Sequence, residues 1–337
     1  MAITNSQAVP FGLLAMYAED MYDPQGANRL TPVFDDRIEK AGWTPRALIT
    51  AEDTLSSLIK TGRYSAALST GRVFFGFLAQ NRTDPLQWVV VLRGTAGPIE
   101  WMIDAQFAPI PHPGHGEARV EHGFFGIYAT MQLADLQGRK TDDRAAAGVA
   151  RLVGPKGKVM ITAHSLGSAL ATYFAQDLAE LIGERASACL FASPRTGDQA
   201  WADLVDRTVK EYAVFNYVID AVTHVPTGLG YVTLPRASRL EPETAQAGIR
   251  VGLGCNHHVI CYCAMLDFAR TMPHARDARD ADCAKCIRGD SDADKQGAID
   301  VQRVFALLID EDRGGPTGKL LKNLGDKLVR QLFRRLR

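Results

Sequence analysis

The chain has 337 residues, of which 46% are hydrophobic and 23% charged, and its formal net charge is zero at neutral pH. These values are typical of a globular protein and exclude a disordered or fibrous chain. With no net positive charge, we expect no nucleic-acid partner.

The sequence contains no run of about 18 apolar residues, so we expect no membrane-spanning helix. The first residues, Met1–Gln7, lack a basic segment followed by an apolar core, and no standard secretory signal is recognised. We therefore expect a protein that is cytoplasmic or exported by a non-standard route.

Hydrophobic patterning predicts strands that alternate with helices. The predicted strands are Arg72–Gln80, Trp88–Leu92, Val159–Ala163, Ala188–Ala192 and Ala213–Ile219. The predicted helices are Ala8–Met21, Gly123–Leu136, Asp142–Leu152, Gly167–Ile182, Gln199–Val209, His257–Arg270 and Gly297–Ile309. This alternation indicates an α/β fold whose mostly parallel central sheet is covered by helices on both faces.

Two late segments depart from this alternation. Gly228–Arg239 has the pattern of a hairpin, and Pro273–Lys295 is highly charged, which is typical of a solvated loop. We expect one domain over residues 1–313, with a charged loop insertion near 273–296, followed by a linker and a basic amphipathic helix over 314–337.

One segment combines a strand, a serine and a helix in immediate succession. The apolar strand Val159–Ala163 leads through His164 to Ser165, and helix-forming residues follow from Gly167. On a sharp strand-to-helix turn a serine hydroxyl can act as a nucleophile, provided that the residues two before and two after it are small. Here these are Ala163 and Gly167, so the sequence predicts a nucleophilic Ser165.

Such a serine needs a histidine base and a carboxylate that orients the histidine. Asp220 ends an apolar strand, at the sheet edge where Ser165 is expected, and is the candidate carboxylate. A turn cap is the alternative role for Asp220. Asp198 and Asp203 are weaker candidates because they lie beside or within the next helix.

The base must come from the histidines that follow Asp220 in the chain. His257 and His258 open a predicted helix after a glycine-rich turn, and the residues alone do not separate them. The tetrahedral oxyanion needs two donors. We expect one to be the backbone N–H of Leu166 and the other to come from the loop Leu92–Thr95.

Five segments follow one another along the chain: Val91–Thr95, Val120–Phe124, Ala163–Gly167, Ala192–Gly197, and Asp220–Val222 with Pro226. In this order they resemble the successive motifs of the class 3 lipases, the fungal-type triacylglycerol lipases. The resemblance implies an α/β-hydrolase fold with a short helical lid, and cofactor-free hydrolysis of lipid esters. It also implies Ser165 and Asp220 as two members of a catalytic triad.

The resemblance assigns two further positions. It implies that Thr95 is the oxyanion residue, acting with the N–H of Leu166. In the family the catalytic histidine is commonly followed five residues later by tyrosine, and His257 with Tyr262 has that spacing. The family pattern therefore favours His257 over His258.

The segment after Thr95 corresponds to the family's lid. Trp101 matches the lid tryptophan, although packing on a surface helix is an alternative, and Asp104 resembles the aspartate that can hold the oxyanion residue. The chain departs from the family pattern at two positions, where we expect only a local adjustment of the structure. These are Ala163 and Ser168, each of which replaces a glycine.

The six cysteines leave the redox state open. Cys283 and Cys286 have the spacing of zinc ligands, but a tetrahedral site needs a second close pair. A disulfide and unpaired thiols are the other states. We assign no metal and no cofactor.

The last segment, Lys319–Arg337, carries seven basic residues and one acidic residue, a net charge of +6 that the rest of the chain balances with −6. Leucines at positions 321, 324, 328, 332 and 336 share one helical face. This pattern is typical of a helix that lies in a lipid interface, and docking on the acidic body is the alternative. We expect a lipid ester substrate at an oil–water or membrane interface, with anionic membrane contact through residues 319–337.

Phospholipase A1 and soluble carboxylesterase activity are the alternatives within ester hydrolysis. The alternative from another class is a catalytically inactive module that binds lipid surfaces.

Overall fold

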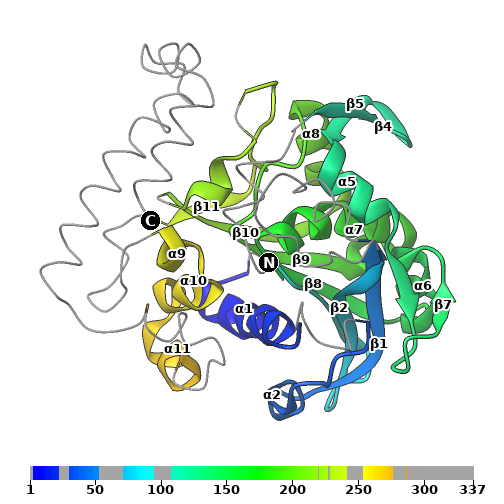
Figure 1. Cartoon of the computed structure of the whole chain (residues 1–337), viewed down its shortest axis with the longest axis vertical. Helices are drawn as coiled ribbons and strands as arrows, with labels where there is room; N and C mark the ends of the chain where they lie inside the picture. Colours follow the sequence, from blue (N-terminus) through cyan, green and yellow to red (C-terminus); the bar gives the residue numbers. More distant parts are fainter. Residues whose placement is uncertain are drawn as a thin grey trace, which may run out of the picture.

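The computed structural model describes residues 3–22, 30–52, 71–94, 108–218, 220–226, 228–240, 253–275 and Cys286. Within these residues nine strands form one sheet in the order β11-β10-β9-β8-β3-β2-β1-β6-β7, and β4 pairs with β5 in a second, small sheet (Figure 1). The strands are β1 Trp43–Glu52, β2 Arg72–Asn81, β3 Gln87–Leu92, β4 Pro109–His112, β5 His115–Glu121, β6 Gln132–Ala134, β7 Lys140–Asp142, β8 Lys158–His164, β9 Ala186–Phe191, β10 Glu211–Tyr217 and β11 Ala237–Leu240.

The helices are α1 Asn5–Asp20, α2 Asp36–Lys40, α5 His122–Ala129, α6 Ala145–Val153, α7 Leu166–Ile182, α8 Gln199–Thr208, α9 Leu253–His257, α10 Val259–Leu266 and α11 Phe268–Ala275, with 3₁₀ turns η1 Gly183–Arg185 and η2 Ala221–His224. None of the helices in the described ranges is long and apolar enough to span a bilayer.

The half of the large sheet that leads to the predicted site is parallel. Strands β3, β8, β9, β10 and β11 pair in parallel with one another, each with the next in this order. Strands β2, β1, β6 and β7 extend the sheet with antiparallel pairs. Because the carboxyl ends of parallel strands meet at one edge, the loops after β3, β8 and β10 lie near one another. The predicted α/β class is confirmed, and β1 is an added strand that no pattern predicted.

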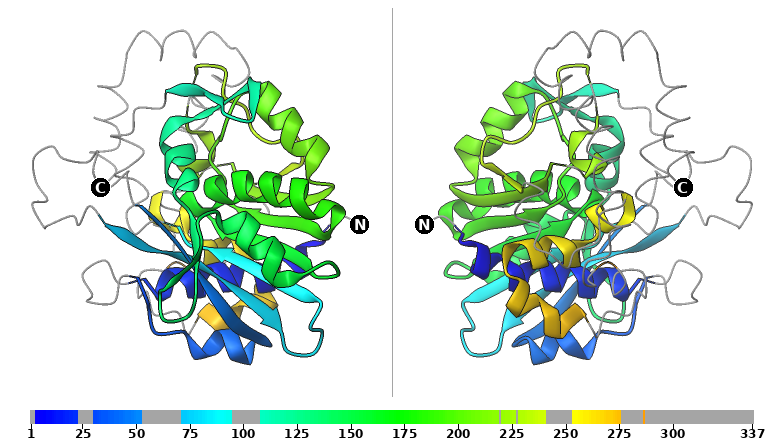
Figure 2. Two further views of the ribbon diagram at one scale, coloured as in Figure 1. Left: turned by 90° about the vertical axis from the view of Figure 1, so that its right-hand side faces the viewer. Right: turned by 90° about the vertical axis from the view of Figure 1, so that its left-hand side faces the viewer.

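Helices cover both faces of the sheet, with α5 to α8 on one side and α1, α10 and α11 on the other (Figure 2). Strand β3 shows why its sequence is a continuous apolar run. Trp88, Val90 and Leu92 join the core beneath α5 to α8, whereas Val89 and Val91 join the core beneath α1 and α10. A strand buried on both faces needs apolar residues at every position.

Helix α1 begins earlier than the predicted Ala8. The backbone N–H of Thr4 donates to Gln7 Oε1 at 2.9 Å, and Gln7 N donates to Thr4 Oγ1 at 3.4 Å. This reciprocal capping box satisfies two backbone donors at the start of the helix, so the helix starts at Asn5.

The predicted helix Gly123–Leu136 is wrong in its second half. Helix α5 ends at Ala129, and the next residues form β6, in which Leu133 lies opposite Ile49 of β1. The apolar pattern predicted correctly that these residues are buried. They form a strand and not a helix because they pair with β1, which the sequence did not predict.

The predicted hairpin over Gly228–Arg239 is also wrong. Gly228, Leu229 and Gly230 adopt positive φ, as turn residues do, but the strand that follows, β11, pairs in parallel with β10. The sequence predicted the turn correctly, but β11 pairs with β10 and not with a strand on the other side of that turn.

The predicted helix His257–Arg270 is divided into three. His258 and Asp267 both adopt extended backbone, with ψ values of 131° and 94°, so α9, α10 and α11 are separate helices. Helix α11 continues to Ala275, three residues into the segment predicted as a charged loop from Pro273. The rest of that loop except Cys286, the predicted helix Gly297–Ile309 and the basic segment 314–337 lie outside the described residues.

Candidate active site

Ser165 occupies a strained turn between β8 and α7. Its φ and ψ are 57° and −130°, a region that residues with a Cβ rarely adopt and that costs about 1–3 kcal/mol. The Ser165 N–H donates to the carbonyl of Phe191 at 3.0 Å, which ties the turn to the end of β9. The turn places the Ser165 side chain at the carboxyl edge of the parallel strands, where the sequence predicted a nucleophile.

The residues around Ser165 are small because the turn packs directly on β3. A Cβ built on Gly167 would lie 2.5 Å from the carbonyl oxygen of Arg93 and 2.7 Å from that of Leu92. These are backbone atoms that cannot move aside, so glycine is required at 167. Ala163 is fully buried in β8, where its single methyl group fits in place of the glycine common in the family.

Ser168 stabilises the same turn, a role for Ser168 that the sequence did not predict. Its hydroxyl lies 2.9 Å from the carbonyl oxygen of Ala163 and 2.7 Å from that of Phe191, and it accepts the N–H of Phe191 at 3.2 Å. A glycine would leave these backbone groups without this partner. The replacement therefore adds contacts between α7 and the two strands beside it.

The structure brings Ser165, His257 and Asp220 into one hydrogen-bonded chain. His257 Nε2 lies 2.7 Å from Ser165 Oγ, and His257 Nδ1 lies 2.8 Å from Asp220 Oδ2. All three residues are at most 4% exposed. Because the carboxylate can only accept, Nδ1 carries the proton, and Nε2 is left to accept the proton of the serine hydroxyl. The structure brings His257 to Ser165, and not His258, which occupies the N-cap position of α10.

Asp220 is held by two donors besides His257. The N–H of Val222 donates to Asp220 Oδ1 at 2.9 Å, and the Tyr262 hydroxyl donates to Asp220 Oδ2 at 2.6 Å. Burial raises the pKa of Tyr262 well above its usual value, so its hydroxyl remains a donor. Asp220 therefore combines both roles considered from the sequence, since it also caps the turn η2.

The sequence indicated only that Tyr262 follows His257 at the family spacing. It did not predict that the Tyr262 hydroxyl contacts the Asp220 carboxylate. The other two carboxylates weighed for this role lie elsewhere. Asp198 caps α8 through the N–H of Trp201 at 2.9 Å, and Asp203 accepts from Gln199 on the surface of the same helix.

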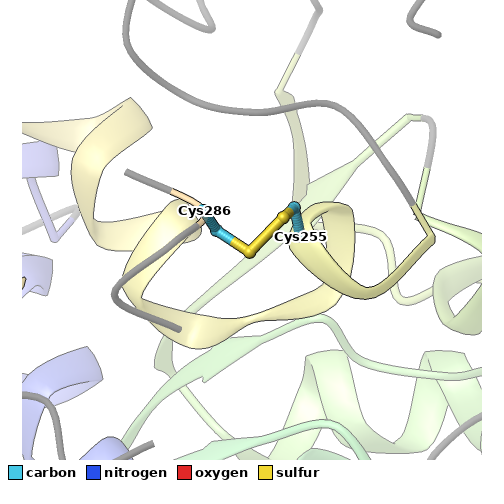
Figure 3. Close-up of a disulfide and its surroundings, with 2 residues drawn as sticks. All are labelled: Cys255 and Cys286. Carbon is cyan, nitrogen blue, oxygen red and sulfur yellow. A yellow bond between two sulfur atoms is a disulfide. The ribbon is translucent and has the colours of Figure 1, made fainter. Parts of the chain in front are cut away.

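A disulfide lies two residues before His257. Cys255, in α9, is bonded to Cys286, which is buried against the core beneath α10 (Figure 3). The bond excludes Cys286 as a thiolate ligand of zinc. Cys189, Cys261 and Cys263 are buried thiols, and burial raises the pKa of each. The part of the chain that the structure describes contains no group of three or more residues arranged to hold a metal ion.

Leu166 is the first residue of α7 and follows the nucleophile directly. The N–H groups in the first turn of a helix have no acceptor within the helix and point toward the site of a developing oxyanion. The expected second donor, Thr95, and the expected lid residues, Trp101 and Asp104, lie outside the described residues.

A serine on a strained turn at the carboxyl edge of a parallel sheet, with its base and acid on later loops, is the arrangement of an α/β hydrolase. The solved complex of Rhizomucor miehei lipase with its propeptide has this fold. It aligns with a TM-score of 0.50 over 77% of this chain and 78% of that chain, at 18% sequence identity.

The family model of the class 3 lipases matches residues 89–229 of this chain. The chain is similar to a lipase of Rhizomucor miehei, with 31% identity over 41% of this chain and 37% of the relative. It is also similar to phospholipase A1 EG1 of Oryza sativa subsp. indica, with 34% identity over 41% of this chain and 35% of the relative. The chain thus matches little more than a third of the length of these relatives.

The disulfide should stabilise the segment that carries His257. It closes a loop of 31 residues, which in the chain-entropy model contributes about 3–4 kcal/mol to the free energy of unfolding. We expect Cys286→Ser to lower the thermal midpoint and to reduce the turnover number of the protein that remains folded. Thermal unfolding and activity are measured with and without a reductant.

The matched control is the double variant Cys255→Ser/Cys286→Ser, whose midpoint should not respond to reductant. A wild-type midpoint that stays constant while two further thiols become titratable would contradict a stabilising role for this bond.

Proposed function

We propose that this protein is a serine hydrolase that cleaves carboxylic esters of lipids, with triacylglycerols as its main substrates. The observation that carries the proposal is the buried chain from Ser165 Oγ through His257 to Asp220. The match of residues 89–229 to the class 3 lipase family model and the names of the relatives support lipid esters as the substrate class.

The geometry supports a two-step acyl transfer. His257 Nε2 accepts the Ser165 hydroxyl proton as Oγ attacks the ester carbonyl, and Asp220 stabilises the imidazolium that forms. The N–H of Leu166, with Thr95 as the second donor, would stabilise the tetrahedral oxyanion. His257 then gives its proton to the departing alcohol oxygen, which leaves the acyl group bound to Ser165.

Water completes the cycle. His257 accepts a proton from water as its oxygen attacks the acyl-enzyme carbonyl, and the collapse of the second tetrahedral intermediate returns the proton to Ser165 and releases the carboxylic acid. Besides water, the cycle uses only side-chain and backbone groups of this chain, and it involves no electron transfer.

Phospholipase A1 activity is the second candidate. Several of the similar curated proteins are named phospholipases A1, including one from Oryza sativa with 34% identity. The same acyl transfer cleaves a phospholipid ester, so the two candidates differ in head group and not in chemistry.

Replacement of the nucleophile tests the reaction. We expect Ser165→Ala to reduce kcat for a chromogenic acyl ester by at least about 10⁴-fold with little change in the free energy of unfolding. Ser187→Ala is the matched control, because Ser187 lies on neighbouring β9 and its hydroxyl lies 3.4 Å from the Val159 carbonyl oxygen and 3.7 Å from Met160 Sδ. Turnover by Ser165→Ala at the wild-type rate would refute the mechanism.

A substrate panel tests the proposed lipid class and the proposed role of the basic segment 314–337. The panel contains a triacylglycerol emulsion, a soluble short-chain ester and phospholipid vesicles with and without anionic lipid. We expect the highest rate on the emulsion, and weaker binding to anionic vesicles when the chain ends at residue 313. A preference for the phospholipid would support phospholipase A1, and unchanged vesicle binding would reject the membrane contact.

A further inference from the structure

Glu19 lies in an unfavourable place for a carboxylate. It is in the last turn of α1, where the helix dipole disfavours negative charge, and no basic residue lies in that turn. Its side chain is 28% exposed but reaches the nucleophile turn, where Oε1 lies 2.7 Å from Nδ1 of His164, the residue before Ser165. Neither helix formation nor the proposed triad accounts for a carboxylate at this position.

His164 has an acceptor at each ring nitrogen. Its Nε2 lies 2.6 Å from the backbone carbonyl oxygen of His257, and its Nδ1 contacts the Glu19 carboxylate. A carbonyl oxygen can only accept, so Nε2 must carry a proton. An ionised carboxylate also accepts, so the second nitrogen carries one too, and the ring is an imidazolium.

Glu19 also contacts the loop on the other side of Ser165. The N–H of Gly94 donates to Glu19 Oε1 at 3.1 Å, and a Cβ at Gly94 would lie 2.6 Å from the same oxygen. Arg93 holds the carbonyl of Gly94 through Nη1 at 2.6 Å. The peptide groups of Gly94 are therefore fixed directly before Thr95, the expected oxyanion residue.

We infer that Glu19 is a positioning residue: with a doubly protonated His164 it fixes the backbone of His257 on one side of Ser165 and the Gly94 peptide on the other. This inference rests on the proposed ester hydrolysis for its effect on rate, but not for the ionisation of the pair.

The surroundings favour the ion pair. The titratable groups that face His164 are Glu19 from α1, Asp220 before η2, His257 from α9 and Tyr262 from α10. Burial opposes the charge on His164, but Glu19 outweighs it and raises the pKa of His164. Burial likewise opposes the charge on Glu19, but His164 and the Gly94 N–H hold the pKa of that carboxyl below its usual value.

These directions fix the sign of the pH dependence. The stabilisation from His164 is fully present below the pKa of an unfolded histidine and is lost as the pH rises through the raised folded value. The stabilisation from Glu19 is lost only as the pH falls through its lowered value. The positioning is therefore complete between these two folded-state pKa values and fails on the alkaline side when His164 loses its proton.

The test combines histidine NMR with kinetics. In ¹⁵N-histidine-labelled wild-type protein, both ring nitrogens of His164 should remain protonated above about pH 7, where an ordinary imidazole is neutral. In Glu19→Gln, His164 should lose its second proton at lower pH, and the alkaline limb of the kcat profile should move down with it. We expect kcat at neutral pH to fall about tenfold to a hundredfold, less than direct loss of an oxyanion donor, with KM little changed.

Asp20→Asn is the matched control. Asp20 is the next residue of α1 and pairs with Arg37 at 2.6 Å, so its loss perturbs the same helix end without touching His164. This variant should keep the wild-type alkaline limb and the wild-type His164 titration.

A neutral His164 in the wild-type protein near neutrality would overturn the inference, whether or not any variant folds. A Glu19→Gln enzyme with wild-type kcat and an unmoved alkaline limb would also overturn it. If the wild-type protein hydrolyses none of the esters, the proposed function fails, and the NMR titration still decides whether the ion pair exists.

Discussion

The conformation of Ser165 is the constraint on which the rest of the site depends. A residue with a Cβ is held at a φ of 57°, and such a conformation persists only when the surroundings determine it. They do so from three sides. Gly167 packs on the carbonyls of β3, the Phe191 carbonyl accepts the Ser165 N–H, and Ser168 links α7 to β8 and β9. The serine hydroxyl is positioned by backbone packing before any catalytic partner contacts it.

The partners reach this hydroxyl because parallel strands end at one edge. Ser165 follows β8 directly, and Asp220 follows β10 closely, so the topology alone places both at the same edge. His257 lies at the end of the short helix α9 and does not directly follow a strand. Its position depends on the Asp220 carboxylate, the disulfide of Cys255 and the contact of its carbonyl with His164.

The sequence predicted what local chemistry determines. The turn that carries Ser165 was predictable because it requires small residues at positions 163 and 167. Asp220 was predictable as the carboxylate because it ends an apolar strand. The choice between His257 and His258 needed the family spacing to Tyr262, since neither residue differs in local pattern. The break after His257, where His258 turns extended, then explains why only one of the two faces Ser165.

Contacts between distant segments were not readable from the sequence. Glu19 and His164 are separated by 145 residues. The sequence left a metal site, a disulfide and unpaired thiols open for the cysteines and did not indicate that Cys255 pairs with Cys286. Strand β6 was mistaken for helix because its partner β1 was itself unpredicted, and β11 was assigned to a hairpin because the pattern of a strand does not name its neighbour. In each case the missing information was the pairing and not the apolar pattern.

The central claim is that His257 activates Ser165 for nucleophilic attack, and covalent labelling tests it most directly. The folded protein is treated with a fluorophosphonate, and its peptides are examined by mass spectrometry with heat-unfolded protein as the control. The account predicts one added phosphonyl group on the peptide that contains Ser165, in the folded protein only. A folded protein that remains unlabelled, or one that is labelled at another residue while Ser165 stays free, would contradict it.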